Sequence, residues 1–362
     1  MPVPDSTPLA PALPEPVFRD ARHHIRIFQG DCLEILAALP ADSVDLIFAD
    51  PPYFLSNNGI TCHAGRMVSV NKGAWDVSRG PDANHDFNRA WLAACQRVLL
   101  PNGSIWVSGT SHVIHSVGFA MQQLGFKLLN DISWVKPNPP PNLSCRYFTH
   151  ATETIIWAAK NKKSRHTFHY RTMKELAGGK QMKSVWTIPP PEPWEKKFGK
   201  HPTQKPLALL ERILLAASSE GDLVLDPFLG SGTSALAALR LSRRAIGVEY
   251  DRISIDLALI RICSDLVQVE ISFASLQFDL DLAPRSVDRS DRAISRTAAM
   301  PPQFQLVHQE LRFYFIGRDD RRIIFSVAAD SLDDAWHKFL STGRPSSDAL
   351  FIIMSHTEIR LV

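Results

Sequence analysis

The sequence predicts an α/β fold, an open sheet flanked by helices, and three observations support this. Short apolar segments with strand character alternate with segments of helical periodicity between residues 24 and 250. Two of the strands, residues 44–49 and 223–225, stop abruptly at the carboxylates Asp50 and Asp226. A chain of 362 residues with 45% apolar content can bury a full core of this kind and has room for a small second module.

The first predicted strand covers residues 24–28, where apolar and polar side chains alternate. Gly30 and Asp31 follow it, and a predicted helix over residues 32–39 leads to the next strand. The carboxylate of Asp31 is well placed to accept hydrogen bonds from the free N–H groups of the first helical turn. We therefore predict that Asp31 is the N-cap of this helix.

The second strand runs into the sequence Asp50-Pro51-Pro52-Tyr53. Prolines cannot extend a hydrogen-bonded ladder, and Pro52 keeps Pro51 out of the helical region, so this corner is stiff. It presents the Asp50 carboxylate, the Pro51 carbonyl and the Tyr53 ring at the carboxyl end of a strand, where open α/β sheets bind ligands. The alternative interpretation is a strand end closed by a proline turn.

Such a corner suits attack by a weak nitrogen nucleophile. The lone pair of the exocyclic amino group of adenine is conjugated with the ring, and it becomes available when two acceptors hold both hydrogens in a tetrahedral arrangement. The Asp50 carboxylate and the Pro51 carbonyl are candidates for these acceptors, and the Tyr53 ring is a candidate to stack on a base extruded from the helix. The predicted catalytic residues are Asp50, Pro51, Pro52 and Tyr53.

Residues 54–81 are rich in Gly, Asn and Ser and carry Arg66 and Lys72. A long loop directly after a catalytic corner is usually functional, so we predict a lid over the extruded base, with these two cations as DNA contacts. The alternative is a surface excursion. The alternation then resumes, with predicted helices over residues 87–98 and 113–124, strands over 104–107, 127–135 and 153–159, and a turn at 101–103.

Positive charge is concentrated in one part of the chain. Residues 136–205 hold fourteen Lys and Arg against four Glu and no Asp, whereas the whole chain has a net charge of only +3. Such a bias is typical of a face that binds a polyanion, although a charge run is more often a solvated surface. We predict a basic target-recognition segment over residues 160–200. The predicted DNA contacts in this part of the chain are Asn142, Arg146, Tyr147, Lys162, Lys163 and Gln181.

A Gly-rich turn follows the strand that ends at Asp226, and a predicted helix over residues 206–218 precedes that strand. The turn fits the dinucleotide fingerprint as Gly230-x-Gly232-x-x-Ala235, which alone is a weak signal. A further strand, residues 245–248, ends at Glu249, nineteen residues after Gly230. That is close to the spacing at which a carboxylate accepts the hydroxyls of a ribose.

Composition narrows the class of protein further. The five cysteines are dispersed without paired spacing, which indicates neither a disulfide framework nor a zinc knuckle and favours a reducing, cytoplasmic compartment. No His/Cys cluster has ligand spacing, so we predict no metal. No apolar run approaches the roughly 20 residues needed to span a bilayer. Residues 1–20 are proline-rich and are predicted to be a disordered tail, not a signal peptide.

Together, the Asp50 corner and the Gly-rich turn resemble the β class of amino-methylating DNA methyltransferases, in which the motif Asp/Asn/Ser-Pro-Pro-Tyr/Phe precedes the cofactor motif Asp-x-Phe-x-Gly-x-Gly-Thr. The resemblance implies a Rossmann-like sheet with permuted motif order and S-adenosylmethionine as cofactor. Residues 201–206 match a further motif of this class. The predicted cofactor contacts are Asp31, Asp50, Thr203, Lys205, Asp226, Phe228, Gly230, Gly232, Thr233 and Glu249.

From about residue 27 to 265 the chain is similar to the second adenine methyltransferase of DpnII-type restriction-modification systems. The proline-rich run at residues 188–193 departs from that pattern. The resemblance implies methylation of adenine N6 in GATC, on single-stranded as well as double-stranded DNA, and it leaves open a homodimer and a companion restriction endonuclease. The similar stretches include loops as well as sheet motifs: residues 48–57, 67–76, 142–149, 174–183 and 199–206.

Residues 21–270 thus form the predicted methyltransferase domain, followed by a linker over 271–303 and a small α+β module over 304–362. This module holds seven Lys and Arg against eight Asp and Glu, so we expect a protein contact or dimer module and not sequence-independent DNA binding. Its predicted elements are strands over 311–316, 322–327, 350–354 and 358–362 and a helix over 332–340. Two alternative functions stay open, cytosine-N4 methylation and a catalytically silent DNA-binding subunit.

Overall fold

A computed structural model describes residues 11–56, 60–63, 66–69, 76–266, 311–317, 323–328, 338, 341 and 349–356. The chain divides into two compact units, Met1–Ile262 and Cys263–Val362. The first unit contains a nine-stranded sheet and the second a three-stranded sheet. The predicted linker over 271–303 lies outside the described residues.

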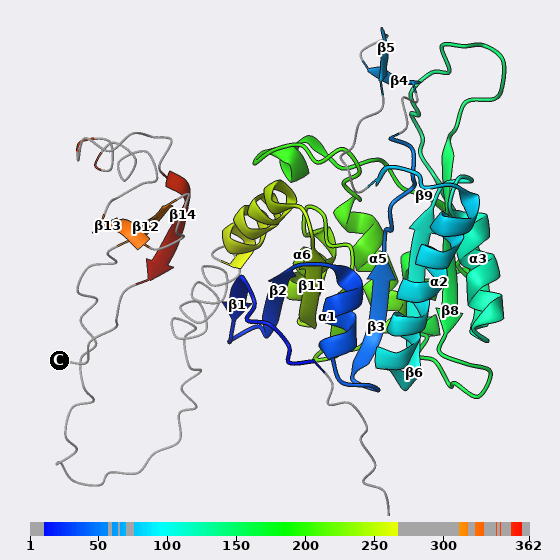
Figure 1. The fold of residues 1–362 in the computed structure, drawn as a ribbon, viewed down its shortest axis with the longest axis horizontal. Helices are drawn as coiled ribbons and strands as arrows, with labels where there is room; N and C mark the ends of the chain where they lie inside the picture. The colour runs from blue at the N-terminus through cyan, green and yellow to red at the C-terminus, as the bar shows by residue number, and fades with distance from the viewer. Residues whose placement is uncertain are drawn as a thin grey trace, which may run out of the picture. The chain divides into compact units, whose positions relative to one another are not determined.

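The large sheet has the strand order β1-β2-β11-β10-β3-β6-β8-β7-β9 (Figure 1). The five neighbouring strands from β2 to β6 in this order are parallel, whereas β1 and β8 run antiparallel to their neighbours. The strands span Phe18–Asp20 (β1), Ile25–Gln29 (β2), Val44–Ala49 (β3), Leu99–Gly109 (β6), Lys127–Val135 (β7), Thr152–Ala159 (β8), Val185–Thr187 (β9), Leu223–Asp226 (β10) and Arg244–Glu249 (β11).

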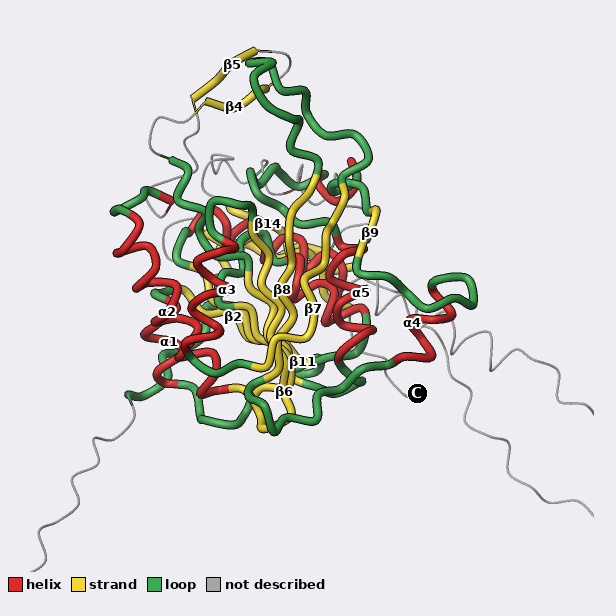
Figure 2. Tube along the Cα trace, turned by 90° about the vertical axis from the view of Figure 1, so that its right-hand side faces the viewer, coloured by secondary structure: helices red, strands yellow, loops and turns green. Residues whose placement is uncertain are grey.

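Helices cover both faces of this sheet. Figure 2 shows α1, α2 and α3 on one side and α4 and α5 on the other, and α6 packs against α5. Ile25, Leu46 and Ile47 are fully buried between these layers, and burial of such a side chain contributes about 1.5–3 kcal/mol. The helices span Cys32–Ala38 (α1), Pro81–Val98 (α2), Ile114–Gln123 (α3), Tyr170–Leu176 (α4), Leu207–Ala217 (α5) and Thr233–Arg240 (α6).

Strands β3 and β10 are far apart in the sequence and adjacent in the sheet. Leu46 pairs with Val224 and Ile47 with Leu225 in a parallel register. Asp50 and Asp226 therefore end neighbouring strands at the same edge of the sheet. This edge, where the carboxyl ends of the parallel strands meet, is the place where open α/β sheets bind ligands. The α/β fold class predicted from the sequence is confirmed.

Most predicted elements of the first unit are confirmed, and three differ. The predicted turn at residues 101–103 belongs to β6, where the register with β3 shifts. Gly103 passes so close to β3 that a Cβ atom there would lie 2.9 Å from the Asp45 carbonyl oxygen. Phe18–Asp20, assigned to the tail, forms the edge strand β1, because a three-residue strand held by backbone pairing has too little periodicity to be recognised. The predicted lid contains a hairpin, Ile60–His63 (β4) and Arg66–Ser69 (β5).

The second unit contains the antiparallel sheet β13-β12-β14. Its strands, Leu311–Gly317 (β12), Ile323–Ala328 (β13) and Ala349–His356 (β14), confirm three of the four strands predicted there. The predicted strand over 358–362 and nearly all of the predicted helix over 332–340 lie outside the described residues. None of the helices in the described part of the chain has the length and apolar character that a bilayer crossing requires.

Candidate active site

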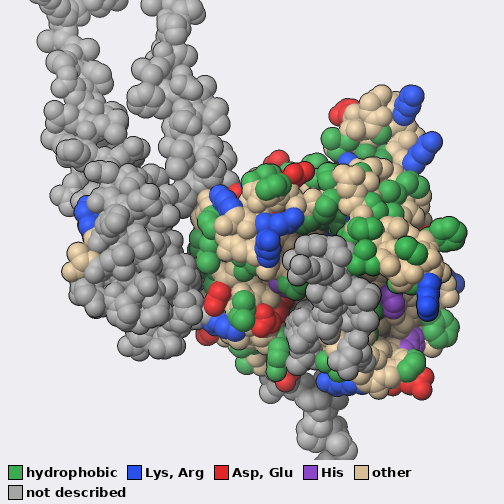
Figure 3. Space-filling model, turned by 90° about the horizontal axis from the view of Figure 1, so that it is seen from above, with side chains coloured by type: hydrophobic (Ala, Val, Ile, Leu, Met, Phe, Trp, Pro, Cys, Tyr) green, Lys and Arg blue, Asp and Glu red, His purple; other side chains and the backbone are tan. Residues whose placement is uncertain are grey.

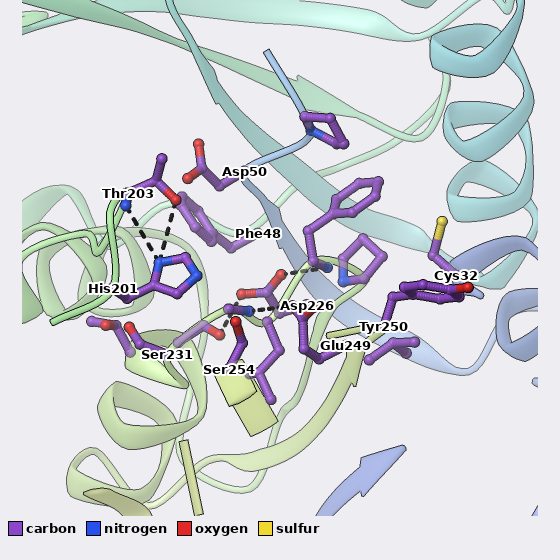
Figure 4. A pocket seen from close by; sticks show the side chains of 18 of the residues that line it. Cys32, Phe48, Asp50, His201, Thr203, Asp226, Ser231, Glu249, Tyr250 and Ser254 are labelled. Atoms are coloured by element: carbon purple, nitrogen blue, oxygen red, sulfur yellow. Dashed lines mark hydrogen bonds between the residues drawn. The ribbon is translucent and has the colours of Figure 1, made fainter. Parts of the chain in front are cut away.

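A cavity of about 430 Å³ lies at the carboxyl edge of the central strands. This volume is within the range of sites that hold a nucleotide-sized ligand. Figure 4 shows Asp50 and Thr203 at one end, Glu249 and Tyr250 at the other, and Asp226 between them. Nine of the ten predicted cofactor contacts line the cavity: Asp31, Asp50, Thr203, Lys205, Asp226, Phe228, Gly230, Thr233 and Glu249.

At the first end, the Asp50 carboxylate is held at both oxygens. Its Oδ1 accepts hydrogen bonds from Ser108 Oγ at 2.5 Å and from the Tyr53 hydroxyl at 2.7 Å. Its Oδ2 forms an ion pair with the Lys205 ammonium. A carboxylate offers about four lone-pair positions, so three donors leave room for one more.

Tyr53 is buried, with 6% of its surface exposed. Its hydroxyl lies 3.3 Å from Glu153 Oε2 in addition to its bond to Asp50. Burial and the neighbouring charges of Asp50 and Glu153 raise the pKa of Tyr53, so the phenol keeps its proton. In this arrangement the ring belongs to the wall behind Asp50. In this conformation the Tyr53 ring is therefore not exposed for the predicted stacking on a base.

Glu153 completes this cluster, and the sequence analysis missed it. Its Oε1 pairs with Lys136 Nζ at 2.5 Å, and its Oε2 lies 3.6 Å from Lys205 Nζ. Burial acts to raise the pKa of Glu153, but the charges of Lys205 and Lys136 outweigh it and lower the pKa to about 2. The only sequence signal was a carboxylate at the start of an otherwise apolar strand.

Asp76 was also missed, and it anchors the backbone after the corner. The fully buried carboxylate accepts hydrogen bonds from the backbone N–H groups of Tyr53, Phe54 and Leu55 at 2.9, 2.7 and 3.2 Å, and from Ser56 Oγ at 2.8 Å. It thus ties the end of the predicted lid segment to its beginning. Phe54 has a φ of +58°, a strained value for a residue with a side chain, which these bonds help to hold.

At the other end of the cavity, carboxylates are held by backbone N–H groups. Glu249 accepts from Gly230 N and from Asp251 N, both at 2.8 Å, and burial raises its pKa. Asp31 accepts from Leu33 N at 2.7 Å, which confirms the predicted cap of α1. Asp31 lies just after β2 and Glu249 is the last residue of β11, and these two strands are neighbours in the sheet.

Asp226 lies between the two ends. It accepts hydrogen bonds from Phe228 N at 2.9 Å and from Ser234 Oγ at 2.5 Å. Burial raises its pKa to about 7, even though both hydrogen bonds act in the opposite direction. The Asp226 side chain therefore fixes the turn from β10 into α6.

The two glycines of the turn have different roles. Gly230 lines the cavity with a φ of +53°, and a Cβ atom there would lie 3.3 Å from His201 Cε1. Gly232, a predicted cofactor contact, is not among the described residues that line the cavity. It begins α6 with a φ of +80°, and a Cβ atom there would lie 2.8 Å from Ala258 Cβ. Position 232 therefore requires glycine because it packs against the helix of residues 252–266.

The segment that carries Thr203 and Lys205 is braced by a short helix at the end of the proline-rich run. The 3₁₀ helix Pro193–Lys196 holds Glu195, whose Oε2 accepts from Leu207 N at 2.8 Å at the start of α5. Gln204 Nε2 donates to the Glu195 carbonyl at 3.0 Å. Glu195 thus anchors the chain on both sides of Lys205, at Gln204 and at Leu207.

The loop of residues 136–151 contains three predicted DNA contacts. It projects beside the β4–β5 hairpin at the same edge as the cavity (Figures 1 and 2). Asn142 folds this loop, because its Nδ2 donates to the Tyr147 carbonyl at 2.6 Å and its Oδ1 accepts from Ser144 N at 3.0 Å. Arg146 and Tyr147 are exposed, as is Phe148. Lys72 and the side chain of Arg66 lie outside the described residues.

Lys162 and Lys163, by contrast, lie at the opposite edge of the sheet. Strand β8 runs antiparallel to β6, with Thr154 beside Gly109 and Ala159 beside Ser104. Residues after 159 therefore emerge away from the Asp50 corner. The prediction of one basic recognition face is wrong in this respect, because a strand reversal separates charges that are close in sequence.

Gln181 lies in the segment that enters β9 at its amino end, away from the 136–151 loop. Figure 3, which looks onto the cavity edge, shows Lys and Arg side chains in separate groups and not in one patch. Within the described residues, no group of His, Cys, Asp and Glu has the arrangement of a metal site.

Residues 44–259 match the family described as DNA methylase. The Type II methyltransferase M2.DpnII of Streptococcus pneumoniae is 55% identical over 227 residues, which cover 62% of this chain and 85% of that protein. The Type II methyltransferase M2.MboI of Moraxella bovis is 48% identical over 237 residues, covering 66% and 87%.

Solved structures agree with these similarities. The crystal structure of the M1.HpyAVI-SAM complex matches with 29% identity and a TM-score of 0.50, covering 66% of this chain and 98% of that one. The cytosine-N4-specific PvuII DNA methyltransferase matches with 22% identity and a TM-score of 0.54, covering 68% and 88%. At that identity the second similarity concerns the fold alone.

Proposed function

This chain belongs to the DNA methylase family, and from that premise we propose that it methylates N6 of adenine in the sequence GATC through the Asp50 corner. It is a DNA methyltransferase that uses S-adenosylmethionine. The choice of adenine is supported by the named Type II relatives and by the sequence resemblance to the GATC-methylating systems. The observation that carries the role of the corner is the position of Asp50 at one end of a cavity of cofactor size.

The cavity fits S-adenosylmethionine in its size and in its polar groups. Glu249 and Asp31 place two carboxylates at one end, where ribose and amino groups need acceptors. Gly230 brings backbone to the cavity wall without a side chain. When bound, the cofactor supplies the electrophilic methyl group. Its reactive end belongs toward Asp50 and Thr203, at the opposite end from Glu249.

The chain's own residues then have to hold the adenine amine. The Asp50 carboxylate has one acceptor position left after binding Ser108, Tyr53 and Lys205. We assign that position to one amine hydrogen and the Pro51 carbonyl to the other. The amine is then held by two acceptors, which frees the nitrogen lone pair for attack and gives the departing proton an acceptor. Pro52 contributes to the wall of the cavity beside them.

DNA would approach the cavity edge, where the 136–151 loop and the β4–β5 hairpin project. Arg146 is exposed on that loop and is our first candidate for a base or phosphate contact. Exposed Tyr147 and Phe148 provide stacking surfaces that do not require a duplex. We further propose that the enzyme works in the cytoplasm beside a companion restriction endonuclease, as a monomer or a homodimer that light scattering would distinguish.

The decisive test is a methylation assay with tritiated S-adenosylmethionine. Duplex and single-stranded oligonucleotides would carry one GATC or the scrambled sequence GTAC, and products would be hydrolysed and identified as nucleosides by mass spectrometry. We expect N6-methyladenine from GATC only. N4-methylcytosine would support the cytosine alternative instead. No transfer by the folded, cofactor-binding protein would indicate a silent DNA-binding subunit.

A further inference from the structure

The cluster behind Asp50 contains a carboxylate to which the proposed chemistry gives no role. Glu153 belongs to β8, its side chain is 10% exposed, and it is not among the described residues that line the cavity. It nevertheless contacts two of the groups that hold Asp50. Its Oε2 lies 3.3 Å from the Tyr53 hydroxyl and 3.6 Å from Lys205 Nζ.

These contacts connect Glu153 to both oxygens of the Asp50 carboxylate. The Tyr53 hydroxyl donates to Asp50 Oδ1, and Lys205 pairs with Asp50 Oδ2. Since one oxygen atom of Glu153 faces the phenol and the ammonium together, moving it would move both of them. Lys136, at 2.5 Å from Glu153 Oε1, holds the other side of the Glu153 carboxylate.

The charges of the cluster are balanced only with Glu153 present. Two carboxylates alternate with two ammonium groups in the order Asp50, Lys205, Glu153, Lys136. An unpaired charge at this depth is unfavourable, because the lost hydration has no replacement. Without Glu153, Lys205 would have Asp50 as its remaining anionic partner in the cluster. The ammonium already pairs with Asp50 Oδ2, so without its contact to Glu153 it would be free to turn about that oxygen and occupy the last acceptor position of Asp50.

We propose that Glu153 is a positioning residue for methyl transfer, which holds Lys205 and Tyr53 so that Asp50 keeps one acceptor direction for the target amine. The proposal rests on the function proposed above, in which Asp50 receives that amine. Glu153 acts through Lys205 and Tyr53 and does not touch substrate. Its removal should therefore lower the rate of methyl transfer much more than it weakens cofactor binding, because Glu249 and Asp31 hold the far end of the cofactor cavity.

The protonation of Lys205 provides a second signature. Around its ammonium lie Asp50 from the β3 end, Glu153 from β8, the Tyr53 hydroxyl and the His201 ring, with Lys136 behind Glu153. Burial acts to lower the pKa of Lys205, but the charges of Asp50 and Glu153 raise it overall. Replacing Glu153 by a neutral side chain removes one of these two charges. The alkaline limb of the kcat profile should then move to lower pH.

The test is Glu153→Gln in the full-length enzyme, assayed in single turnovers on a GATC duplex at saturating S-adenosylmethionine. We expect the single-turnover rate constant to fall about 10- to 100-fold, the scale of a misplaced reacting group, with cofactor Kd within two-fold. The alkaline limb should shift down, and Glu153→Asp should restore part of the rate. Glu220→Gln is the matched control, since Glu220 is exposed in the turn before β10.

The outcomes separate this proposal from the function on which it rests. No methylation by the wild-type enzyme would refute the proposed function itself. An active wild type with an unchanged rate and pH profile in Glu153→Gln would overturn the positioning role. A variant with a lower melting temperature but full kcat per folded molecule would assign Glu153 to stability alone. If Glu153→Gln does not fold, a full rate and unshifted profile in Glu153→Asp would overturn the proposal.

Discussion

Buried carboxylates behind the Asp50 end of the cavity and toward its Glu249 end have pKa values shifted in opposite directions. At the Asp50 end, the pKa of Glu153 is lowered to about 2, because two lysines outweigh its burial. At the Glu249 end, burial raises the pKa of Glu249. Between the two ends, burial raises the pKa of Asp226 to about 7, and its hydrogen-bond donors are a backbone N–H and a hydroxyl. Buried carboxylates therefore have pKa values shifted in opposite directions, depending on whether an ammonium group is in contact.

This difference matches what each end has to do. An end that orients an amine needs charges that do not change with pH, and contact between lysines and carboxylates provides them. An end that binds neutral hydroxyls needs acceptors held in place by the backbone, as Glu249 is held by Gly230 and Asp251. Removing the ammonium, the carboxylates at each end and the buried ionisable group of Asp226 one at a time tests this division.

The largest expected effect comes from Lys205→Met, which removes the cation between Asp50 and Glu153. Breaking a buried ion pair by removing one partner typically costs about 3–5 kcal/mol. The free energy of unfolding at pH 7, measured by urea denaturation, should fall by about that amount. The matched control is Lys163→Met at the opposite edge, where the lysine is exposed. Equal stability of the two variants would mean that the cluster does not need its cation.

Asp50→Ala should have the next largest effect, on rate. Loss of a preorganised electrostatic partner costs about 10²- to 10³-fold in kcat, or about 2.7–4 kcal/mol. Cofactor Kd, measured by calorimetry, should stay within a few-fold because Glu249 and Asp31 lie at the other end. Asp131→Ala, at an exposed carboxylate of β7, is the control. A normal rate in Asp50→Ala would place the chemistry elsewhere.

These residues also mark where sequence reasoning succeeded. The Asp50 and Asp226 ends were recognisable because each follows a short apolar strand and begins a turn with proline or glycine. Their adjacency was not predicted, since spacing in the sequence does not put β3 beside β10. The pairing of Leu46 with Val224 supplies the physical reason.

Other features left no local signal. Glu153 contacts the Tyr53 hydroxyl, about a hundred residues away in the sequence. Asp76 binds the segment after Tyr53, about twenty residues away. Nothing in their own neighbourhood predicts such contacts. Lys162 and Lys163 show the opposite case. Their local charge predicted DNA contacts, but β8 runs antiparallel to β6 and places them at the edge of the sheet opposite the Asp50 corner. Charge clustering in sequence is evidence of a common face only when no strand reversal intervenes.

A smaller effect is expected at the cofactor end from Glu249→Gln. Glutamine keeps one acceptor but turns an amide N–H₂ toward a backbone donor, and hydrogen bonds to charged groups contribute about 1.5–3 kcal/mol. Cofactor Kd should rise about 10- to 100-fold, while kcat at saturating cofactor changes little. Glu153→Gln should instead lower the rate of methyl transfer and leave the cofactor Kd nearly unchanged. If Glu249→Gln lowered kcat and left Kd intact, the division between the two ends would be wrong.

The smallest effect concerns pH and Asp226. Its folded-state pKa of about 7 lies above the ordinary value of 3.8, so the folded protein binds this proton more tightly than the unfolded chain does. The contribution of this proton to the stability of the fold is fully present below the ordinary pKa of 3.8 and is lost as the pH rises through the folded-state pKa of about 7. Glu153 contributes to stability with the opposite pH dependence. Its contribution is present above its ordinary pKa of 4.5 and is lost as the pH falls through its folded-state pKa of about 2.

Asp226→Asn removes this ionisation and can keep both hydrogen bonds, since its oxygen can accept from Phe228 N and its amide can donate to Ser234 Oγ. Without cofactor, its melting temperature at pH 8 should exceed that of the wild type by a few degrees, equivalent to about 1 kcal/mol. At pH 5 the difference should shrink, because Asp226 in the folded wild type is then already protonated. Scanning calorimetry at both pH values measures this directly. A difference that is the same at both pH values would show that Asp226 is ionised throughout, and that burial does not control its charge.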